Sequence, residues 1–183
     1  MYQARLAGLT SPSRGPMVLD GGLATELMVR GHDLSDRLWS ARLLATDPDA
    51  IEAVHLAYFR AGAHVAISAS YQASIEGFQA AGIARDEALE LIRWSVRLAQ
   101  AARATMDAEV GVDADRPRLI AGSVGPYGAM LADGSEYRGG YDTDPARLTA
   151  FHRCWPRCRA VDRARRKSRA ASRRTRPDRK SVV

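Results

Sequence analysis

The sequence predicts an α/β fold built from βα units around a parallel sheet. Short apolar runs alternate with longer stretches of helical periodicity, which is typical of parallel strands connected by helices. The runs cover residues 17–19, 63–69 and 118–121. Polar residues follow each run, and in open sheets and closed barrels alike the chemistry lies at the carboxyl ends of the strands. The alternation by itself favours neither architecture.

The first strand and the helix that leads to the second strand have clear boundary signals. Met17–Leu19 is the expected strand, and Asp20 follows it before two glycines. Asp47 is an expected N-cap, with Pro48 at the first helical position and Gly62 placed to end the helix. The helix is expected to turn inward Ile51, Val54, Tyr58 and Ala61.

The remaining elements follow the same alternation. Residues 63–69 form the expected second strand, and a helix from about Asp86 to Met106 turns small and apolar residues inward. Arg118–Ala121 is the expected third strand. Thr143-Asp144-Pro145 repeats the helix-start chemistry, and Pro156 is expected to interrupt the helix that follows.

Charge and periodicity divide the chain into three parts. Residues 1–16 are an expected flexible lead-in, and residues 17–153 form the expected domain. Through Arg153 the basic residues are 15 arginines, against 19 acidic residues. Residues 154–183 hold 10 Arg and 2 Lys against 2 Asp, with almost no apolar periodicity. The net charge of +6 therefore comes from this last segment, which we expect to be disordered.

The composition also narrows the class of protein. A run of 18 apolar residues is absent, so a membrane-spanning helix is not expected, and residues 1–16 lack the apolar stretch of a secretory signal. Both cysteines, Cys154 and Cys158, lie in the basic segment, so the domain has no disulfide framework. A reducing, cytoplasmic location fits these features.

Several short segments carry a resemblance to a known family. They are LDGGLATEL at 19–27, DRLWS at 36–40, YFRAGA at 58–63 with SYQA at 70–73, AGSVGPYG at 121–128 and LADGSEYRG at 131–139. Together they closely resemble the homocysteine S-methyltransferases, most strongly the branch that uses S-methylmethionine or S-adenosylmethionine as methyl donor. The resemblance covers about residues 17–153.

The resemblance implies a (β/α)8 TIM barrel, which needs about 250 residues. The chain is then expected to be the N-terminal part of such a barrel, truncated before closure. Three strands cannot close an eight-stranded sheet, so we expect an exposed apolar edge and a marginally stable, aggregation-prone chain.

The resemblance also implies a reaction, methyl transfer from a sulfonium donor to homocysteine, which gives methionine. In the family a zinc ion holds the homocysteine sulfur as a thiolate. Three cysteines bind that zinc, and a glutamate holds the substrate amine. Neither the cysteines nor the glutamate has a counterpart here, so we expect very low or no activity from this chain.

Five positions are predicted to bind the substrate by this resemblance. Asp20 and Gly21 match the family's substrate-binding Asp-Gly, and Trp39 matches a tryptophan that walls the homocysteine site. Ser68 and Tyr71 align with residues that line the same pocket. Without the resemblance, a turn residue is the more ordinary reading of Asp20, and a core residue is the more ordinary reading of Trp39.

Two histidine patterns raise the question of a metal. His152, Cys154 and Cys158 form an H-x-C-x3-C pattern, but no fourth ligand is evident, so a native zinc site is not expected there. His55 lies on an apolar helix face, where a hydrogen-bonded core histidine is expected rather than a ligand.

The basic segment allows two interpretations. An out-of-frame translation of a GC-rich gene after about codon 153 would give mainly Arg, Ala, Ser and Pro, and the composition of the segment favours this reading. The alternative is a nucleic-acid-binding protein that uses the segment as an arm, with non-specific, salt-sensitive contacts to phosphates.

Overall fold

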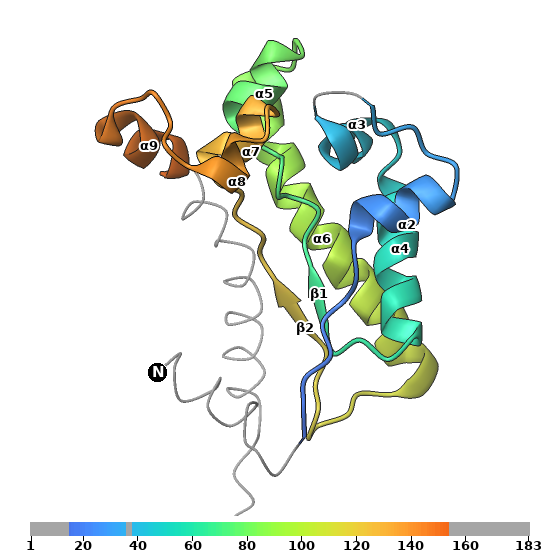
Figure 1. Ribbon diagram of the computed structural model, residues 1–183. Coiled ribbons are helices and arrows are strands. Elements are labelled where there is room, and N and C mark those ends of the chain that lie inside the picture. The colour runs from blue at the N-terminus through green and yellow to red at the C-terminus, as the bar shows by residue number, and fades with distance from the viewer. Residues whose placement is uncertain (1–14, 36–37, 154–183) are drawn as a thin grey trace, which may run out of the picture.

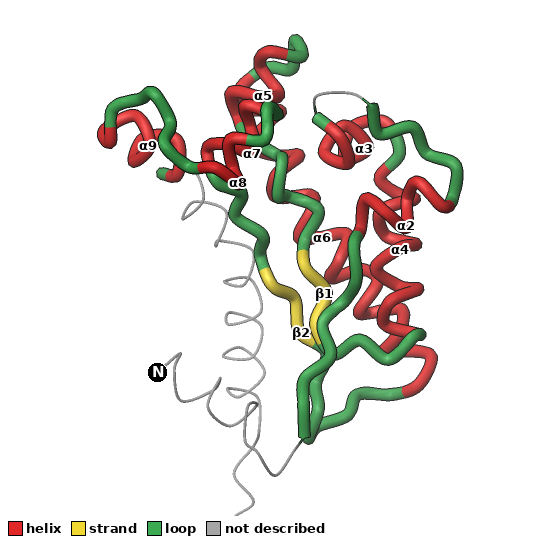
Figure 2. Tube along the Cα trace, viewed as in Figure 1, coloured by secondary structure: helices red, strands yellow, loops and turns green. Residues whose placement is uncertain are grey.

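The computed structural model describes residues 15–35 and 38–153 of the 183-residue chain, and the structural statements below concern these residues. Helices pack against one face of a small parallel sheet (Figures 1 and 2). The elements are, in chain order, α2 (Leu23–Val29), η2 (Trp39–Arg42, a 3-10 helix), α3 (Leu43–Thr46), α4 (Pro48–Arg60), β1 (Val65–Ile67), α5 (Ile75–Ala80), α6 (Arg85–Val110), β2 (Leu119–Ala121), α7 (Tyr127–Leu131), α8 (Ser135–Arg138) and α9 (Pro145–His152).

The strand segments are parallel and lie in chain order. β1 pairs with β2 in a register that places Val65 opposite Leu119 and Ile67 opposite Ala121. On the other side of β1, Leu19 forms a parallel bridge with Val65. Parallel neighbours need a crossover connection, and here α4 and α6 lie on the two connections. The predicted βα alternation is therefore confirmed for the described residues.

Regular strand structure is shorter than the sequence predicted. The expected strand 63–69 is regular over Val65–Ile67, and the expected first strand is reduced to the bridge at Leu19. The shortening after Ile67 has a local cause. The Ser68 N–H still donates to the Ala121 carbonyl. After it, the hydroxyls of Ser68 and Ser70 bond the Ser123 N–H and carbonyl in place of further strand pairing.

The start of α4 follows the predicted capping chemistry. The Asp47 carboxylate accepts a hydrogen bond from the Ala50 N–H at 3.3 Å, and Pro48 occupies the first turn. The buried face is rotated slightly from the expected one, because Tyr58 is half-buried and Ala61 lies beyond the helix. The fully buried residues are Ile51, Val54, His55 and Phe59.

α6 is longer than predicted at both ends and packs against α4 and the back of β1. Its buried residues recur every three or four positions and are mostly small, which lets the helices approach closely. They are Ala88, Ile92, Ser95, Leu98, Ala99, Ala102 and Met106. Arg93 and Arg97, on the outer side of α6, both form ion pairs with Glu90.

The sequence reading missed the short helical elements. α2, η2, α3, α5, α7 and α8 each have seven residues or fewer, which is too short for helical periodicity to stand out. One of them has a readable signal, because the Ser74 hydroxyl caps α5 by accepting from the Gly77 N–H at 3.0 Å.

α9 begins as predicted, with the Asp144 carboxylate accepting from the Ala146 N–H at 2.7 Å. Its described part ends at His152, and Pro156 lies outside the described residues, so the predicted interruption stays a prediction. In the part of the chain that the structure describes, none of the helices combines the length and apolar character needed to cross a bilayer.

His55 is a core residue, as predicted, but its expected hydrogen bonds are absent. The side chain is fully buried on α4, and neither ring nitrogen meets a hydrogen-bond partner among the described residues. Burial in these apolar surroundings lowers the pKa of His55 to about 4. The histidine is therefore neutral in the folded chain at neutral pH.

Candidate functional site

Asp20 stands at the carboxyl end of the first strand segment with one oxygen bonded and one free. Its Oδ2 accepts a hydrogen bond from the Ile67 N–H at 2.7 Å. Its Oδ1 is buried and accepts no hydrogen bond from a described residue. Burial raises the pKa of Asp20, and the bond from Ile67 partly offsets that rise. The carboxylate therefore has one buried oxygen whose hydrogen-bonding capacity no described residue uses.

Gly21 lies where the strand end meets α4. A Cβ at this position would come within 2.8 Å of the Tyr58 hydroxyl oxygen, so a side chain here would require the Tyr58 ring to shift. The Tyr58 hydroxyl donates to the Gly22 carbonyl at 3.2 Å and fixes this turn onto the helix. Burial raises the pKa of Tyr58, and the charges of Glu26 and then Asp20 raise it further. The turn that carries Asp20 is thus braced by α4.

A network of buried serine hydroxyls joins the ends of β1 and β2. The Ser70 hydroxyl donates to the Ser123 carbonyl at 2.9 Å, and the Ser123 N–H donates to the Ser68 hydroxyl at 2.9 Å. The two hydroxyls lie 2.8 Å apart, and because the Ser70 hydrogen is already used, Ser68 donates to Ser70. Ser68, a predicted substrate contact, therefore has its hydrogen bonded within the protein.

The loop after β2 packs directly on the segment after β1. A Cβ added at Gly125 would lie 1.7 Å from the Tyr71 carbonyl oxygen, so no side chain fits between them. On its other side the Gly125 carbonyl lies 3.3 Å from Nε2 of His152. Tyr71, a predicted site residue, keeps 44% of its surface exposed above this contact. Its ring is therefore available to a ligand while its backbone is fixed.

A second carboxylate at this end of the sheet was not predicted. Glu136, on α8, has a buried Oε2 with no hydrogen-bond partner among the described residues. The pKa of Tyr71 is raised by burial and then by the charge of Glu136, which places the two side chains near each other. Gly128 contacts both the Glu136 backbone and the Tyr141 ring, so a Cβ there would clash with each. The 131–139 motif contains Glu136 and was the available sequence signal.

These groups lie at one end of the molecule. In Figure 1 the strand arrows point toward the end occupied by α5, α7 and α8, which is the carboxyl end of the sheet. Asp20, Tyr71 and Glu136 follow the first, second and third strand segments. Carboxylate oxygens without protein partners at this end of the sheet suit a small molecule that carries a positive charge or N–H donors.

Three predicted features have no described side-chain geometry. Trp39 begins η2, and only its backbone is described. Cys154 and Cys158 lie outside the described residues, as does the basic segment proposed to contact nucleic acid. Within the ranges 15–35 and 38–153, no group of three or more His, Cys, Asp or Glu side chains could hold a metal ion.

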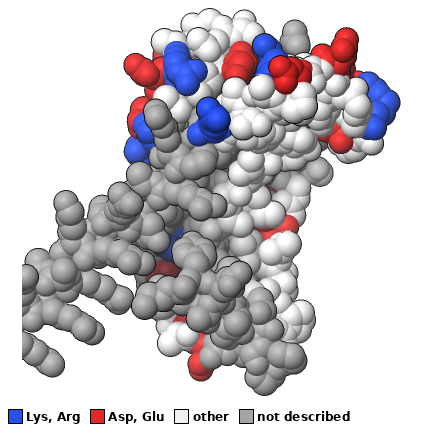
Figure 3. Space-filling model, turned by 90° about the vertical axis from the view of Figure 1, so that its left-hand side faces the viewer, with Lys and Arg blue, Asp and Glu red and all other residues white. Residues whose placement is uncertain are grey.

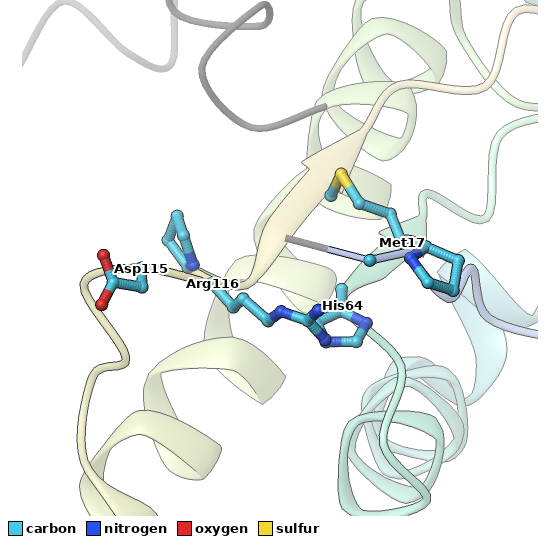
Figure 4. Close-up of a pocket in the computed structure, with 7 residues that line it drawn as sticks. Met17, His64, Asp115 and Arg116 are labelled. Atoms are coloured by element: carbon cyan, nitrogen blue, oxygen red, sulfur yellow. The ribbon is translucent and has the colours of Figure 1, made fainter. Parts of the chain in front are cut away.

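Cavities lined by described residues lie at the opposite, amino ends of the strands. One has a volume of about 10 Å³, and Figure 4 shows Arg116 extending toward the ring of His64 there. A larger, open one of about 220 Å³ also includes His64 and Arg116 in its lining. The His64 ring has a structural task, because its Nδ1 accepts the Val18 N–H at 3.1 Å. We assign the candidate site to the carboxyl ends, where the unpaired carboxylate oxygens lie.

Comparison with known proteins gives a consistent set of relatives. Residues 17–164 match the family model described as homocysteine S-methyltransferase, past the boundary that composition places after Arg153. Homocysteine S-methyltransferase 4 of Zea mays is 52% identical over 153 residues, which cover 81% of this chain and 45% of that protein. The homocysteine S-methyltransferase of Escherichia coli is 50% identical over 149 residues, covering 79% and 46%.

A solved structure resembles the described fold as well. The metallated form of the homocysteine methyltransferase MmuM from Escherichia coli superposes with a TM-score of 0.74 at 47% identity, covering 82% of this chain and 52% of that one. The chain therefore spans about half the length of the curated relatives and of the solved chain that it matches.

Proposed function

Because the chain belongs to the homocysteine S-methyltransferase family, we propose that residues 17–153 form the homocysteine-binding part of a methyltransferase. The observation that carries this proposal is Asp20, whose buried Oδ1 is unpaired at the carboxyl end of the first strand segment. It stands at the position that matches the family's substrate-binding Asp-Gly. A cytoplasmic location accords with an enzyme of small-molecule metabolism.

The fold that we propose for the whole domain is a (β/α)8 barrel, of which this chain supplies the first βα units. Support comes from parallel strand segments in chain order and from helices on one face of the sheet. Chemistry at the carboxyl ends of such strands is the general rule for this architecture.

The reaction that we propose is methyl transfer from the sulfonium of S-methylmethionine or S-adenosylmethionine to homocysteine. The thiolate sulfur of homocysteine forms a bond to the methyl carbon while the bond from that carbon to the donor sulfur breaks. The donor leaves as a neutral thioether, the thiol proton goes to solvent, and homocysteine becomes methionine. An in-line displacement of this kind depends on positioning.

Residues of this chain supply part of that positioning. Asp20 accepts a hydrogen bond from homocysteine through its Oδ1, and the Gly21 turn keeps the carboxylate in place. Tyr71 and Trp39 form walls of the pocket. Ser68 contributes through the hydroxyl network that fixes the β1 and β2 loops, and thus supports Tyr71 from behind.

The described residues do not fit the zinc ion that the family resemblance implies. They include no cysteine, and they form no cluster that could hold a metal ion. The metal ligands that the resemblance implies are therefore not among the described residues. The match to the metallated relative covers 52% of that relative's chain.

Replacing Asp20 with asparagine is expected to weaken homocysteine binding by about tenfold to a hundredfold. The substitution removes a charged acceptor, and hydrogen bonds to charged groups contribute about 1.5–3 kcal/mol. Isothermal titration of the chain with L-homocysteine under reducing conditions measures the change. Asp113→Asn, at the amino ends of the strands, is the matched control and should bind as wild type does.

Loss of folding would not explain such a result. The pKa of Asp20 is raised in the folded chain, so its ionised form costs stability at a pH above that raised pKa and its protonated form does not. Asp20→Asn should therefore be at least as stable as wild type at pH 7, as urea unfolding can establish. Unchanged affinity in a folded Asp20→Asn chain would contradict the proposed site.

A further inference from the structure

The Asp20 carboxylate occupies a place in the sheet that a backbone carbonyl normally fills. The Asp20 N–H donates to the Val65 carbonyl at 2.9 Å, as in regular parallel pairing. In that pairing the next bond would run from the Ile67 N–H to the Asp20 carbonyl, but this N–H donates to Oδ2 of the Asp20 side chain at 2.7 Å. The backbone after Asp20 therefore leaves the sheet, while the side chain stays bonded to it.

This carboxylate is not held by a basic side chain. In Figure 3 the charged side chains gather at the upper end, where α5, α8 and α9 lie. Within residues 15–35 and 38–153, however, no Arg or His side chain forms an ion pair or a hydrogen bond with Asp20. Its position depends on the Ile67 N–H and on the path of the Gly21-Gly22 backbone. Because glycine allows many backbone conformations, a further contact is needed to fix that path.

Tyr58 on α4 supplies the contact. Its hydroxyl donates to the Gly22 carbonyl at 3.2 Å, and the same carbonyl accepts the Glu26 N–H at 3.1 Å at the start of α2. α2 lies against α4 (Figure 1). The Tyr58 ring is itself anchored, since it packs against both apolar clusters of the core. The hydroxyl therefore ties the backbone two residues after Asp20 to a core helix.

The Tyr58 hydroxyl holds the turn without occupying the carboxylate. Burial and then the charges of Glu26 and Asp20 raise the pKa of Tyr58, so the hydroxyl keeps its hydrogen at neutral pH. A hydroxyl has only one hydrogen to donate, and this one is bonded to the Gly22 carbonyl. Tyr58 therefore does not donate to Asp20, whose Oδ1 has no partner among the described residues.

We propose that Tyr58 is a positioning residue of the homocysteine site that acts through Asp20. Its hydroxyl fixes the Gly21-Gly22 turn, so that the Asp20 carboxylate stays bonded to the Ile67 N–H. The inference rests on the proposed function, because Tyr58 has this role only if Asp20 contacts homocysteine. Every contact that carries it joins described residues of the first strand segment, α2, α4 and β1.

Tyr58→Phe tests the inference, because it removes the hydroxyl and keeps the ring. It is expected to weaken homocysteine binding by the full chain about threefold to tenfold, the effect of one neutral hydrogen bond. Titration calorimetry measures the change. In the Asp20→Asn background the same substitution should weaken binding less than about twofold, because a residue that acts through Asp20 has little effect once the carboxylate is gone. An effect of equal size in both backgrounds would overturn the inference.

Ser95→Ala is the matched control. Ser95 is buried on α6, and its hydroxyl donates to the Ile92 carbonyl at 2.7 Å, so this variant also loses one bond from a hydroxyl to a carbonyl. It should bind homocysteine as the wild type does. A loss of affinity equal to that of Tyr58→Phe would show general loosening of the fold and would contradict a positioning role.

Amide hydrogen exchange of the Ile67 N–H, followed by NMR, is a second readout that needs no ligand. Loosening of the turn should speed this exchange at least about fivefold in Tyr58→Phe. The Ser68 N–H, which donates to the Ala121 carbonyl at 2.9 Å, should keep its rate. Equal acceleration of both amides, or of neither, would overturn the inference.

Gly21→Ala gives the same test if Tyr58→Phe fails to fold. A Cβ at this position would lie 2.8 Å from the Tyr58 hydroxyl oxygen, so the ring must move, and exchange of the Ile67 N–H should again accelerate. An unchanged rate would count against the inference. Absence of homocysteine binding by the folded wild type would contradict the proposed function alone, and the exchange rates would then decide whether Tyr58 positions Asp20.

Discussion

Gly125→Ala is expected to lower the free energy of unfolding by about 3 kcal/mol, the largest stability loss that we predict for a single methyl group. The new Cβ would lie 1.7 Å from the Tyr71 carbonyl oxygen and 2.8 Å from its carbonyl carbon. Both are backbone atoms, so no side-chain rotation relieves the clash. His152 lies against the Gly125 carbonyl on the other side, which limits how far the loop can retreat.

The effect should reach the candidate site. Moving Gly125 displaces either Tyr71 or the loop whose Ser123 bonds to Ser68 and Ser70. Gly122→Ala is the matched control, because a Cβ at Gly122 meets no atom within 4 Å, and it should change stability by less than about 0.5 kcal/mol. Urea unfolding measures both variants. A Gly125→Ala chain as stable as the control would show that the two loops are not packed as described.

His55→Leu is expected to raise the free energy of unfolding at pH 7 by about 1–3 kcal/mol. Both ring nitrogens are buried without partners among the described residues, and an unsatisfied buried polar group costs about that amount. Leucine fills a similar volume with apolar atoms, and its neighbours on α4 are already apolar. The stabilisation is measured by urea unfolding.

The same substitution should remove acid sensitivity. The pKa of His55 falls from 6.5 to about 4 on folding, so the unfolded chain binds more protons between these values. The stability that depends on neutral His55 is therefore fully present above pH 6.5 and is lost as pH falls toward 4. His55→Asn retains a polar side chain without titration and should flatten this slope without the gain at pH 7. An unchanged slope in both variants would contradict the buried position of His55.

Local chemistry explains which parts of the fold could be predicted from the sequence. The Asp-Pro pairs at 47–48 and 144–145 predicted helix starts because each side chain caps a backbone N–H within three residues. The serine network escaped prediction for the opposite reason. Ser70 and Ser123 are 53 residues apart, and nothing in either local sequence shows that their strands end side by side.

The candidate site, too, could be predicted only in part from the sequence. The resemblance singled out Asp20 and Tyr71, and the structure places both at the carboxyl end of the sheet. The resemblance could not indicate that Oδ1 of Asp20 is unpaired, because the pairing of this carboxylate depends on the Ile67 N–H from a different strand. Glu136 was missed because a carboxylate in a short helix carries no periodic signal, and its relation to Tyr71 arises only when β1 and β2 pair.

A calorimetric titration of the wild-type chain with L-homocysteine, alongside L-homoserine, tests the proposed substrate site most directly. The two ligands differ only in sulfur against oxygen, and the buffer is treated with a chelator so that binding reports on the protein alone. We predict saturable binding of both through the amino-acid group that Asp20 contacts, and weaker binding of both in Asp20→Asn. The absence of any saturable binding by the folded wild-type chain would contradict the assignment of a homocysteine site to this part of the family fold.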